Sequence, residues 1–250
     1  MARYNKSIPH PGASFEETNR GMLRLVAKTM GPLIKEVVFL GGTVLPFLLS
    51  SRFRQYVRIA KDVDCIVDLD SKQEIYLFED ELRERGFTKR RNGAVCQWTF
   101  QGVNIDVLPA DPEILSFNNR WCREAMEYAQ PITLEEDLTI NAISPAYFLA
   151  VKFDAFYQRG RGYYLTSPDM YDVVLLMAGQ PDIVVDVRDR TSEALKQYFS
   201  HELQKLLDHS DNLSQLIPTL FPENRDVQRQ LPLVVSGIRE IISMKPVAIA

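Results

Sequence analysis

The sequence predicts an α+β (α/β) protein with a small mixed, mostly antiparallel sheet flanked by helices, followed by a helical C-terminal half. Residues 37–40 and 63–69 are continuous apolar runs of strand length, typical of buried strands. An Asn-Gly pair at residues 92–93 separates two further runs and is a strong β-hairpin signal. Beyond these runs the pattern becomes helical, because Ser-Pro pairs at residues 144–145 and 167–168 combine an N-cap serine with a proline at the first helical position.

The N-terminal elements are predicted from capping residues and periodicity. Residues 1–13 carry two prolines and a glycine and predict an irregular arm. Residues 14–31 open with an N-cap serine, carry apolar residues at helical spacing and close with a glycine, so we expect an amphipathic helix. Helices are also favoured over residues 43–51 and over residues 71–85, which a glycine follows directly.

The remaining elements follow from the same signals. Residues 103–109 form an apolar run and predict a strand beyond the hairpin. Residues 110–137 are rich in proline, asparagine and acids, and we expect them to be irregular apart from an amphipathic piece at residues 121–128. Further helices are expected after each Ser-Pro pair and over residues 192–208 and 233–243.

The composition indicates a globular protein. The 250 residues are 46% hydrophobic, which is enough to bury a core, and no apolar run approaches the ~20 residues that span a membrane. The N-terminus lacks the apolar stretch of a secretory signal, so we expect a cytoplasmic protein that makes no membrane contact. Cys65, Cys96 and Cys122 lack the spacing of metal ligands and are expected to be buried thiols.

The charge distribution restricts how this protein could bind a polyanion. Its net charge of −4 is not that of a protein that coats nucleic acid, so a polyanion must be held locally. Two basic clusters could hold it, and solvated surface charge is the alternative interpretation of both. The first cluster is Arg52, Arg54, Arg58 and Lys61, and the second is Lys89, Arg90 and Arg91 at the hairpin.

Two acidic residues open the second apolar run. Asp62 and Asp64 are separated by one residue, so in a strand their side chains point the same way, with Cα atoms roughly 6.6 Å apart. Two carboxylates at this spacing can converge on one or two divalent metal ions. Asp68 lies about 13 Å further along the strand, too far for one metal cluster. We therefore interpret Asp68 and Asp70 as acids at the strand end and the helix cap.

A glycine turn follows the first strand. Backbone N–H groups at Gly41-Gly42 can approach an anionic group closely, because glycine has no side chain in the way. A helix that starts at Thr43 would direct the positive end of its dipole to the same place. A phosphate cradle beside a carboxylate pair indicates phosphoryl or nucleotidyl chemistry.

A third carboxylate interrupts the apolar strand at residues 103–109. An unpaired buried carboxylate costs several kcal/mol, so Asp106 should have a metal ion or another cation as its partner. If this strand lies beside the strand at residues 63–69, Asp106 meets Asp62 and Asp64. An edge-strand aspartate that faces water is the alternative.

These residues resemble a known family. Gly41-Gly42, Asp62-x-Asp64 and the lone strand residue Asp106 resemble the signature of the DNA polymerase β-like nucleotidyltransferase superfamily. Further along, SPAYFLAVKFDAFYQRGRG, a short loop and SPDMYDVVLL are similar to the lysine and aspartate motifs of the AbiEii-type nucleotidyltransferases. Members of that family are the toxins of type IV toxin–antitoxin systems. The resemblance extends from residue 37 to residue 177.

The resemblance implies a nucleotidyltransferase catalytic core over residues 1–135 and a mainly helical region over residues 136–250 that completes the active-site cleft. Nucleoside triphosphate (NTP) would be the substrate and Mg²⁺ or Mn²⁺ the metal. The roles implied for the first part are phosphate contacts from Gly41, Gly42 and Thr43, and metal binding by Asp62 and Asp64. Asp106, which matches the wider superfamily better than the toxin family, would hold the metal on the nucleophile side.

In the second part the resemblance implies that Lys152 reaches the triphosphate, although a lysine on a core helix can also simply extend its charge to the surface. Either Asp169 or Asp172 would occupy the second acidic position, and the sequence leaves open which. Asp169 could instead be an acid favoured by a helix N-terminus, and Asp172 could pair with a loop arginine. Arg159 and Arg161 are further candidates for phosphate binding.

The function implied is the transfer of a nucleoside monophosphate (NMP) from an NTP to a hydroxyl group, with RNA, specifically tRNA, as acceptor and a cognate antitoxin as partner. Two other interpretations stay open. The acceptor hydroxyl could belong to a small molecule or a protein, or the chain could be a nucleotide-binding or interaction protein without turnover.

Overall fold

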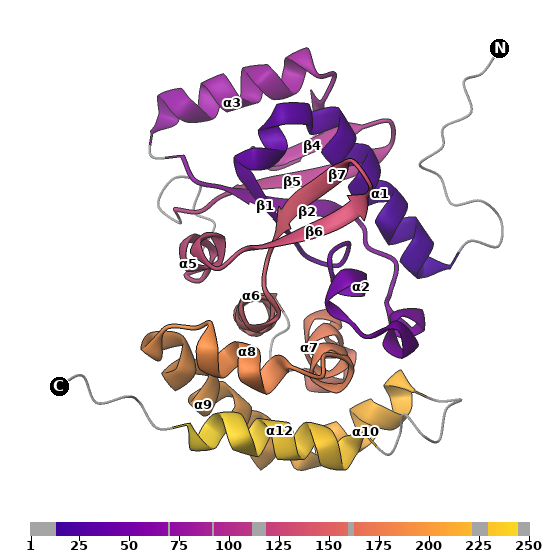
Figure 1. The fold of residues 1–250 in the computed structure, drawn as a ribbon, viewed down its shortest axis with the longest axis vertical. Coiled ribbons are helices and arrows are strands. Elements are labelled where there is room, and N and C mark those ends of the chain that lie inside the picture. The colour runs from indigo at the N-terminus through magenta and orange to yellow at the C-terminus, as the bar shows by residue number, and fades with distance from the viewer. Residues whose placement is uncertain are drawn as a thin grey trace. The chain divides into compact units, whose positions relative to one another are not determined.

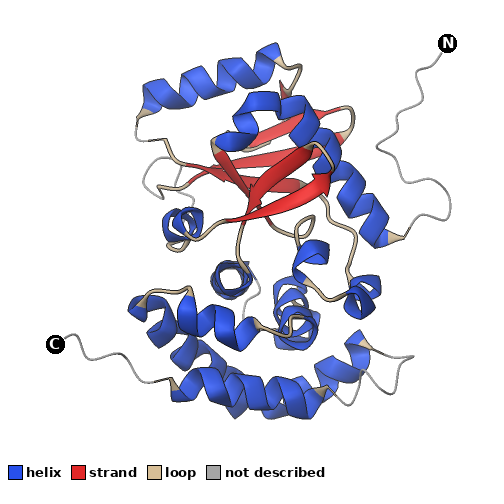
Figure 2. Cartoon of the chain, in the orientation of Figure 1, coloured by secondary structure: helices blue, strands red, loops and turns tan. Residues whose placement is uncertain are grey.

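The structure is a computed structural model of the chain, and it describes residues 14–69, 71–91, 93–111, 119–159, 163–221 and 230–244. The predicted fold class is confirmed: Figure 2 shows one open mixed sheet flanked by helices and a helical C-terminal half. The chain divides into two compact units. The sheet unit comprises Met1–Phe47 and Val57–Ile143, and the helical unit comprises Leu48–Tyr56 and Ser144–Ala250.

The sheet has seven strands in the order β3-β4-β5-β2-β1-β7-β6. The pairs β2–β5 and β1–β7 are parallel and the other neighbouring pairs are antiparallel, so the sheet is mixed and mostly antiparallel. The strands are β1 (Val37–Leu40), β2 (Val63–Val67), β3 (Thr88–Lys89), β4 (Gln97–Phe100), β5 (Val103–Pro109), β6 (Gln130–Glu135) and β7 (Leu138–Ala142).

The helices predicted over residues 14–31 and 71–85 are confirmed. The N-cap Ser14 and Glu17 form a reciprocal capping box, in which each side chain accepts a hydrogen bond from the other residue's backbone N–H. Ser71 caps the later helix by accepting a bond from the Glu74 backbone. These helices and their neighbours are α1 (Phe15–Met30), η1 (Gly31–Lys35), α3 (Lys72–Glu84) and α5 (Cys122–Glu127), and Figure 1 labels the three α-helices among them.

The two faces of the sheet differ. Residues at paired positions of neighbouring strands point to the same face. On one face, Val67, Trp98 and Val107 line a small cavity together with Phe78 and Leu82 of α3, so this helix covers that face. The opposite face carries polar side chains of β2, β4 and β5, among them Asp64, Gln97 and Asp106, and we call it the acidic face.

The described part of the helical unit consists of helices and short turns. Every helix predicted after residue 144 is present, and the N-cap serines Ser167 and Ser192 each accept a backbone hydrogen bond in the first turn. The elements are η2 (Ser51–Tyr56), α6 (Pro145–Arg159), η3 (Tyr164–Thr166), α7 (Pro168–Gly179), α8 (Ile183–Asp189), α9 (Glu193–Asp208), α10 (Ser210–Leu220) and α12 (Leu231–Ser243).

The helix predicted over residues 43–51 is wrong in extent, since α2 covers only Leu45–Leu48. Hydrogen bonds from Val44 N–H to the Gly41 carbonyl and from Phe47 N–H to the Val44 carbonyl span three residues, so tight turns replace the regular helical ladder. The Ser50 N–H donates to the Gly179 carbonyl at 2.9 Å instead of continuing the helix.

The prediction that residues 110–137 are irregular is also wrong, because β6 lies within them. This strand is at the sheet edge and carries Pro131, and a proline normally argues against a strand except at an edge. The amphipathic piece predicted in the same stretch is confirmed as α5. The predicted irregular arm at residues 1–13 and Asn92 of the hairpin lie outside the described residues.

The cysteines are not disulfide-bonded. Cys65 and Cys122 are buried as predicted, whereas Cys96 is half-buried. Burial and the neighbouring charges of Asp64 and Asp106 raise the pKa of the Cys65 thiol. No helix in the described part of the chain is both long and apolar enough to cross a membrane.

Candidate active site

The turn after β1 is built to accommodate an aspartate. Gly41 has a φ of +77°, a conformation that favours glycine. A Cβ atom placed on Gly41 would lie 2.0 Å from Oδ2 of Asp64, so the carboxylate rests against the bare glycine backbone. Gly42 is also tightly packed, since its added Cβ would lie 3.2 Å from the Cβ of Ala60. Gly41 therefore makes room for Asp64 at the end of β1, whereas Gly42 packs against Ala60.

A buried asparagine of α1 holds the two segments that lead to this turn and to the acidic pair. The Asn19 amide donates to the Arg58 carbonyl at 2.8 Å and to the Gly42 carbonyl at 3.4 Å, and its oxygen accepts from the Ala60 N–H at 2.9 Å. Asn19 thus ties the glycine turn to the backbone just before Asp62. Such a buried side-chain network fixes the backbone, because each of its polar groups is expensive to leave unpaired.

The carboxylates of β2 and β5 lie side by side. Asp64 is paired with Asp106 across the parallel strands and with Leu40 across the antiparallel strands. The two aspartates therefore share the acidic face, with Cα atoms about 5 Å apart at the usual strand spacing. Asp62 directly precedes β2 and is close enough for its charge to raise the pKa of Asp106.

Gln97 of β4 orients Asp106. Its Nε2 donates to Oδ2 of Asp106 at 3.2 Å, and its Oε1 accepts from the Ala94 N–H at 3.2 Å, which fixes the direction of the amide. Within the described structure, Oδ1 of Asp106 is buried and has no hydrogen-bond partner. Burial raises the pKa of Asp106, and the Gln97 hydrogen bond opposes this effect. One oxygen of this carboxylate is therefore held in place while the other is left for a ligand.

The donor set fits a hard divalent cation. Mg²⁺ prefers carboxylate oxygens, which Asp62, Asp64 and Asp106 supply, and an oxygen of Asp106 that has no hydrogen bond is the expected sign of a missing cation partner. Among the described residues, no group of three or more His, Cys, Asp or Glu side chains is already gathered as a metal site. Asp64 and Asp106 therefore lie at neighbouring strand positions, as predicted, and metal binding by their carboxylates stays a prediction.

Of the residues predicted to contact phosphate, Gly41 is buried and Gly42 is half-buried. Thr43 is fully buried, and its hydroxyl has no hydrogen-bond partner within the described residues.

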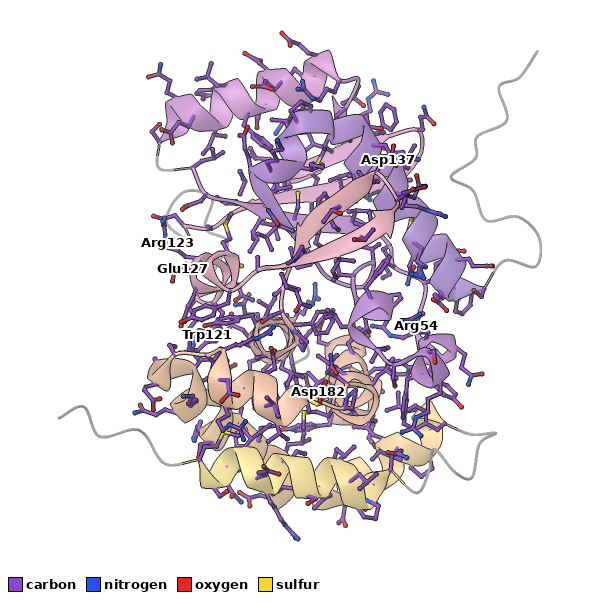
Figure 3. All side chains as sticks on the ribbon, viewed as in Figure 1. Arg54, Trp121, Arg123, Glu127, Asp137 and Asp182 are labelled. Carbon is purple, nitrogen blue, oxygen red and sulfur yellow. The ribbon has the colours of Figure 1, made fainter. Side chains whose placement is uncertain are left out.

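Asp68 is paired with Arg123 of α5, which Figure 3 labels, at 2.9 Å, in keeping with the interpretation of Asp68 as a strand-end acid. Asp70 and Arg161 lie outside the described residues.

Within each of the two basic clusters, the residues differ in their surroundings. In the hairpin, Lys89 points to the face covered by α3, where it pairs with Glu79 and stacks over the Trp98 ring at 4.1 Å. Arg90 follows it and is exposed. In the first cluster, Arg52 and Arg54 belong to the helical unit, and Arg58 and Lys61 belong to the sheet unit.

The helical unit contains a charged cluster of its own residues. Nζ of Lys152 lies 2.7 Å from Oδ2 of Asp172 and 3.3 Å from Oδ1 of Asp169. Arg159 binds both oxygens of Asp169, at 2.8 and 2.7 Å. The two aspartates are 1% and 2% exposed, so their charges are compensated inside the protein. The structure therefore unites four of the predicted residues in one ion-pair network.

Opposing effects act on the pKa of Asp169. Burial raises it, but the hydrogen bonds from Arg159 and the positive charge of Lys152 outweigh burial, and the pKa lies below its usual value. The carboxylate is therefore kept ionised. The prediction that Lys152 reaches the triphosphate stays a prediction.

Asn19 and Gln97 were not among the predicted site residues. Asn19 sits in a helix of clear amphipathic pattern, and only the fold brings it to two distant turns. Gln97 follows the Asn-Gly turn by a few residues, and its pairing with Asp106 requires the register of β4 and β5. An Asp in the middle of a strand, opposite a polar residue of the next strand, is the signal that could have indicated it.

The open mixed sheet thus places a glycine turn against one carboxylate and a second carboxylate at the paired position of the next strand, which is the arrangement that the sequence predicts for a nucleotidyltransferase. The model of the family described as "Nucleotidyl transferase AbiEii toxin, Type IV TA system" matches residues 25–236. The chain belongs to this family of nucleotidyltransferase toxins, as the resemblance in the sequence predicted. No curated protein matches the sequence.

Proposed function

We propose that the chain transfers an NMP from an NTP to a hydroxyl group of RNA, with a tRNA end as the acceptor, and that it acts as a toxin controlled by a cognate antitoxin. The observation that carries the proposal is the pairing of Asp64 with Asp106 next to Gly41. The family supports nucleotidyl transfer, and the acceptor and the metal dependence are the steps that we add.

In this proposal each residue of the sheet unit has a distinct task. Asp62, Asp64 and Asp106 hold Mg²⁺ or Mn²⁺, which would lower the pKa of the attacking hydroxyl and offset charge on the leaving pyrophosphate. Gly41 and Gly42 offer a backbone without side chains to the triphosphate. Asp106, whose side chain is held by Gln97, is also the base that accepts the proton of the attacking hydroxyl. Asn19 keeps the turn and the acidic pair in register.

The test is incubation of the protein with each labelled NTP, Mg²⁺ and total tRNA. We expect label on tRNA with the wild type and none with Asp64→Ala. Asp68→Ala is the matched control, because Asp68 follows the same strand, pairs with Arg123 and lies beyond the predicted metal cluster. Loss of transfer in both variants, or in neither, would contradict the assignment of Asp64.

A second candidate is transfer to a small molecule or to a protein hydroxyl. The net charge of −4 favours it, because an acidic protein repels a long polyanion. Label that appears on a non-RNA species in the same incubation would support this candidate. Binding of NTP without any transfer would instead indicate a protein that keeps the fold without turnover.

A further inference from the structure

The acidic face carries an ordered row of side chains across four strands and the turn beside them. The Arg90 N–H donates to the Gln97 carbonyl at 2.9 Å, which continues the β3–β4 register by one residue. Gln97 is paired with Asp106, and Asp106 with Asp64. Because side chains at paired positions share a face, Arg90 is on the acidic face, whereas Lys89 is on the face covered by α3.

Arg90 differs from its neighbour in how its charge is used. Lys89 is occupied by Glu79, by the Val95 carbonyl and by the Trp98 ring. The exposed Arg90 side chain has no ion pair or hydrogen bond with the residues that the structure describes. Its five donors are available to an anion from outside.

The position of Arg90 on the acidic face indicates which anion it can bind. The glycine turn lies at the β1 end of the row, beside Asp64, and Arg90 lies at the opposite end, beyond Asp106. The triphosphate of the proposed reaction belongs at the glycine end. An anion at the Arg90 end is therefore a second one, about two strand spacings, or roughly 10 Å, from Asp106.

We propose that Arg90 binds a backbone phosphate of a single-stranded RNA acceptor whose terminal hydroxyl is presented to Asp106. The inference rests on the proposed nucleotidyl transfer and adds the acceptor side of that site. Asp62, Asp64 and Asp106 repel a polyanion, and a guanidinium group next to them offsets this repulsion where the acceptor enters. A small-molecule or protein acceptor has no phosphodiester at that position.

The test measures binding of a short single-stranded RNA, labelled with fluorescein at its 5′ end, by anisotropy over a range of salt concentrations. We expect Arg90→Gln to weaken binding about tenfold, the loss of one charge-assisted contact, and to reduce the salt slope by about 0.7. Arg90→Lys keeps the charge and should retain most of the salt slope. Lys35→Gln removes an exposed charge two residues before β1 begins, at the end of this strand away from the glycine turn. It should leave the Kd for RNA within about twofold of the wild-type value.

Steady-state transfer sharpens the result, because Arg90→Gln should raise KM for RNA and leave KM for NTP unchanged. Equal effects of Arg90→Gln and Arg91→Gln would indicate diffuse hairpin charge and would overturn the proposal. So would wild-type binding by Arg90→Gln, or no RNA binding by the wild type. RNA binding that depends on Arg90 without any NMP transfer would overturn the proposed function and leave the Arg90 site standing.

Discussion

The two units use their carboxylates in opposite ways. In the sheet unit, Asp64 and Asp106 are half-buried side by side, and burial raises the pKa of Asp106. In the helical unit, Asp169 and Asp172 are almost fully buried, and Lys152 and Arg159 neutralise them at hydrogen-bonding distance. The chain therefore supplies cations to one set of acids, whereas Asp106 keeps an oxygen that no described residue satisfies.

This difference indicates what the acids of each unit can do. Two carboxylates at neighbouring strand positions repel each other, so holding them there costs stability that an external cation would recover. A buried acid with its own cation contributes little to binding from outside, but removal of one partner leaves an uncompensated buried charge. Substitutions in the sheet unit should therefore affect activity, and substitutions in the helical network should affect stability first.

The largest effect is expected for Asp64→Asn. We expect NMP transfer to fall by about a thousandfold or more, because the amide keeps the shape of the side chain but loses the negative charge. The free energy of unfolding should change by less than about 1 kcal/mol. Transfer assays and urea unfolding measure the two effects. A large loss of stability would show that Asp64 is a structural residue, like the acids of the helical unit.

The helical network should give the opposite result. Lys152→Met removes the buried cation that lies 2.7 Å from Oδ2 of Asp172, so we expect a loss of about 3 to 5 kcal/mol in unfolding free energy. Lys152→Met combined with Asp172→Met removes both charges and should recover a large part of that loss. If Lys152→Met unfolds like the wild type while transfer is lost, Lys152 acts on the substrate.

The comparison also shows which parts of the site a sequence can predict. Asp62, Asp64 and Asp106 could be proposed as site residues because strand alternation is local, and a carboxylate inside an apolar run has few structural explanations. The order of β5 beside β2 was a hypothesis that only the fold could establish. Gln97 and Asn19 were missed because their partners are set by strand register and by helix packing.

In the helical unit the spacing contained more information than was used. Lys152 and Arg159 are seven residues apart, and Asp169 and Asp172 are three apart, so each pair lies on one side of its helix. Two such faces on neighbouring helices predict an ion-pair network. The edge strand β6 could not be predicted in this way, because its proline and its exposed, polar residues remove the usual strand signal.

The dependence of Asp64 on the glycine turn is tested by Gly41→Ala. The new Cβ would meet the Asp64 carboxylate at 2.0 Å in a backbone conformation that alanine disfavours, so we expect a loss of about 2 to 3 kcal/mol in stability together with reduced transfer. Gly21→Ala is the matched control, because nothing lies within 4 Å of its added Cβ in α1, and alanine favours a helix by about 1 kcal/mol. Equal stability of the two variants would contradict the close approach.

The smallest effect is a pH dependence in the helical unit. Because the pKa of Asp169 is lowered in the folded state, its stabilisation is present above the ordinary value of 3.8 and is lost as the pH falls below it. Asp169→Asn should therefore be about 2 kcal/mol less stable than the wild type at neutral pH, and this gap should shrink in acid. Asp208→Asn, at the exposed end of α9, is the control and should stay within about 0.5 kcal/mol of the wild type at neutral pH. Urea unfolding at a series of pH values measures both, and a constant gap for Asp169→Asn would mean that the ion pairs contribute nothing to stability.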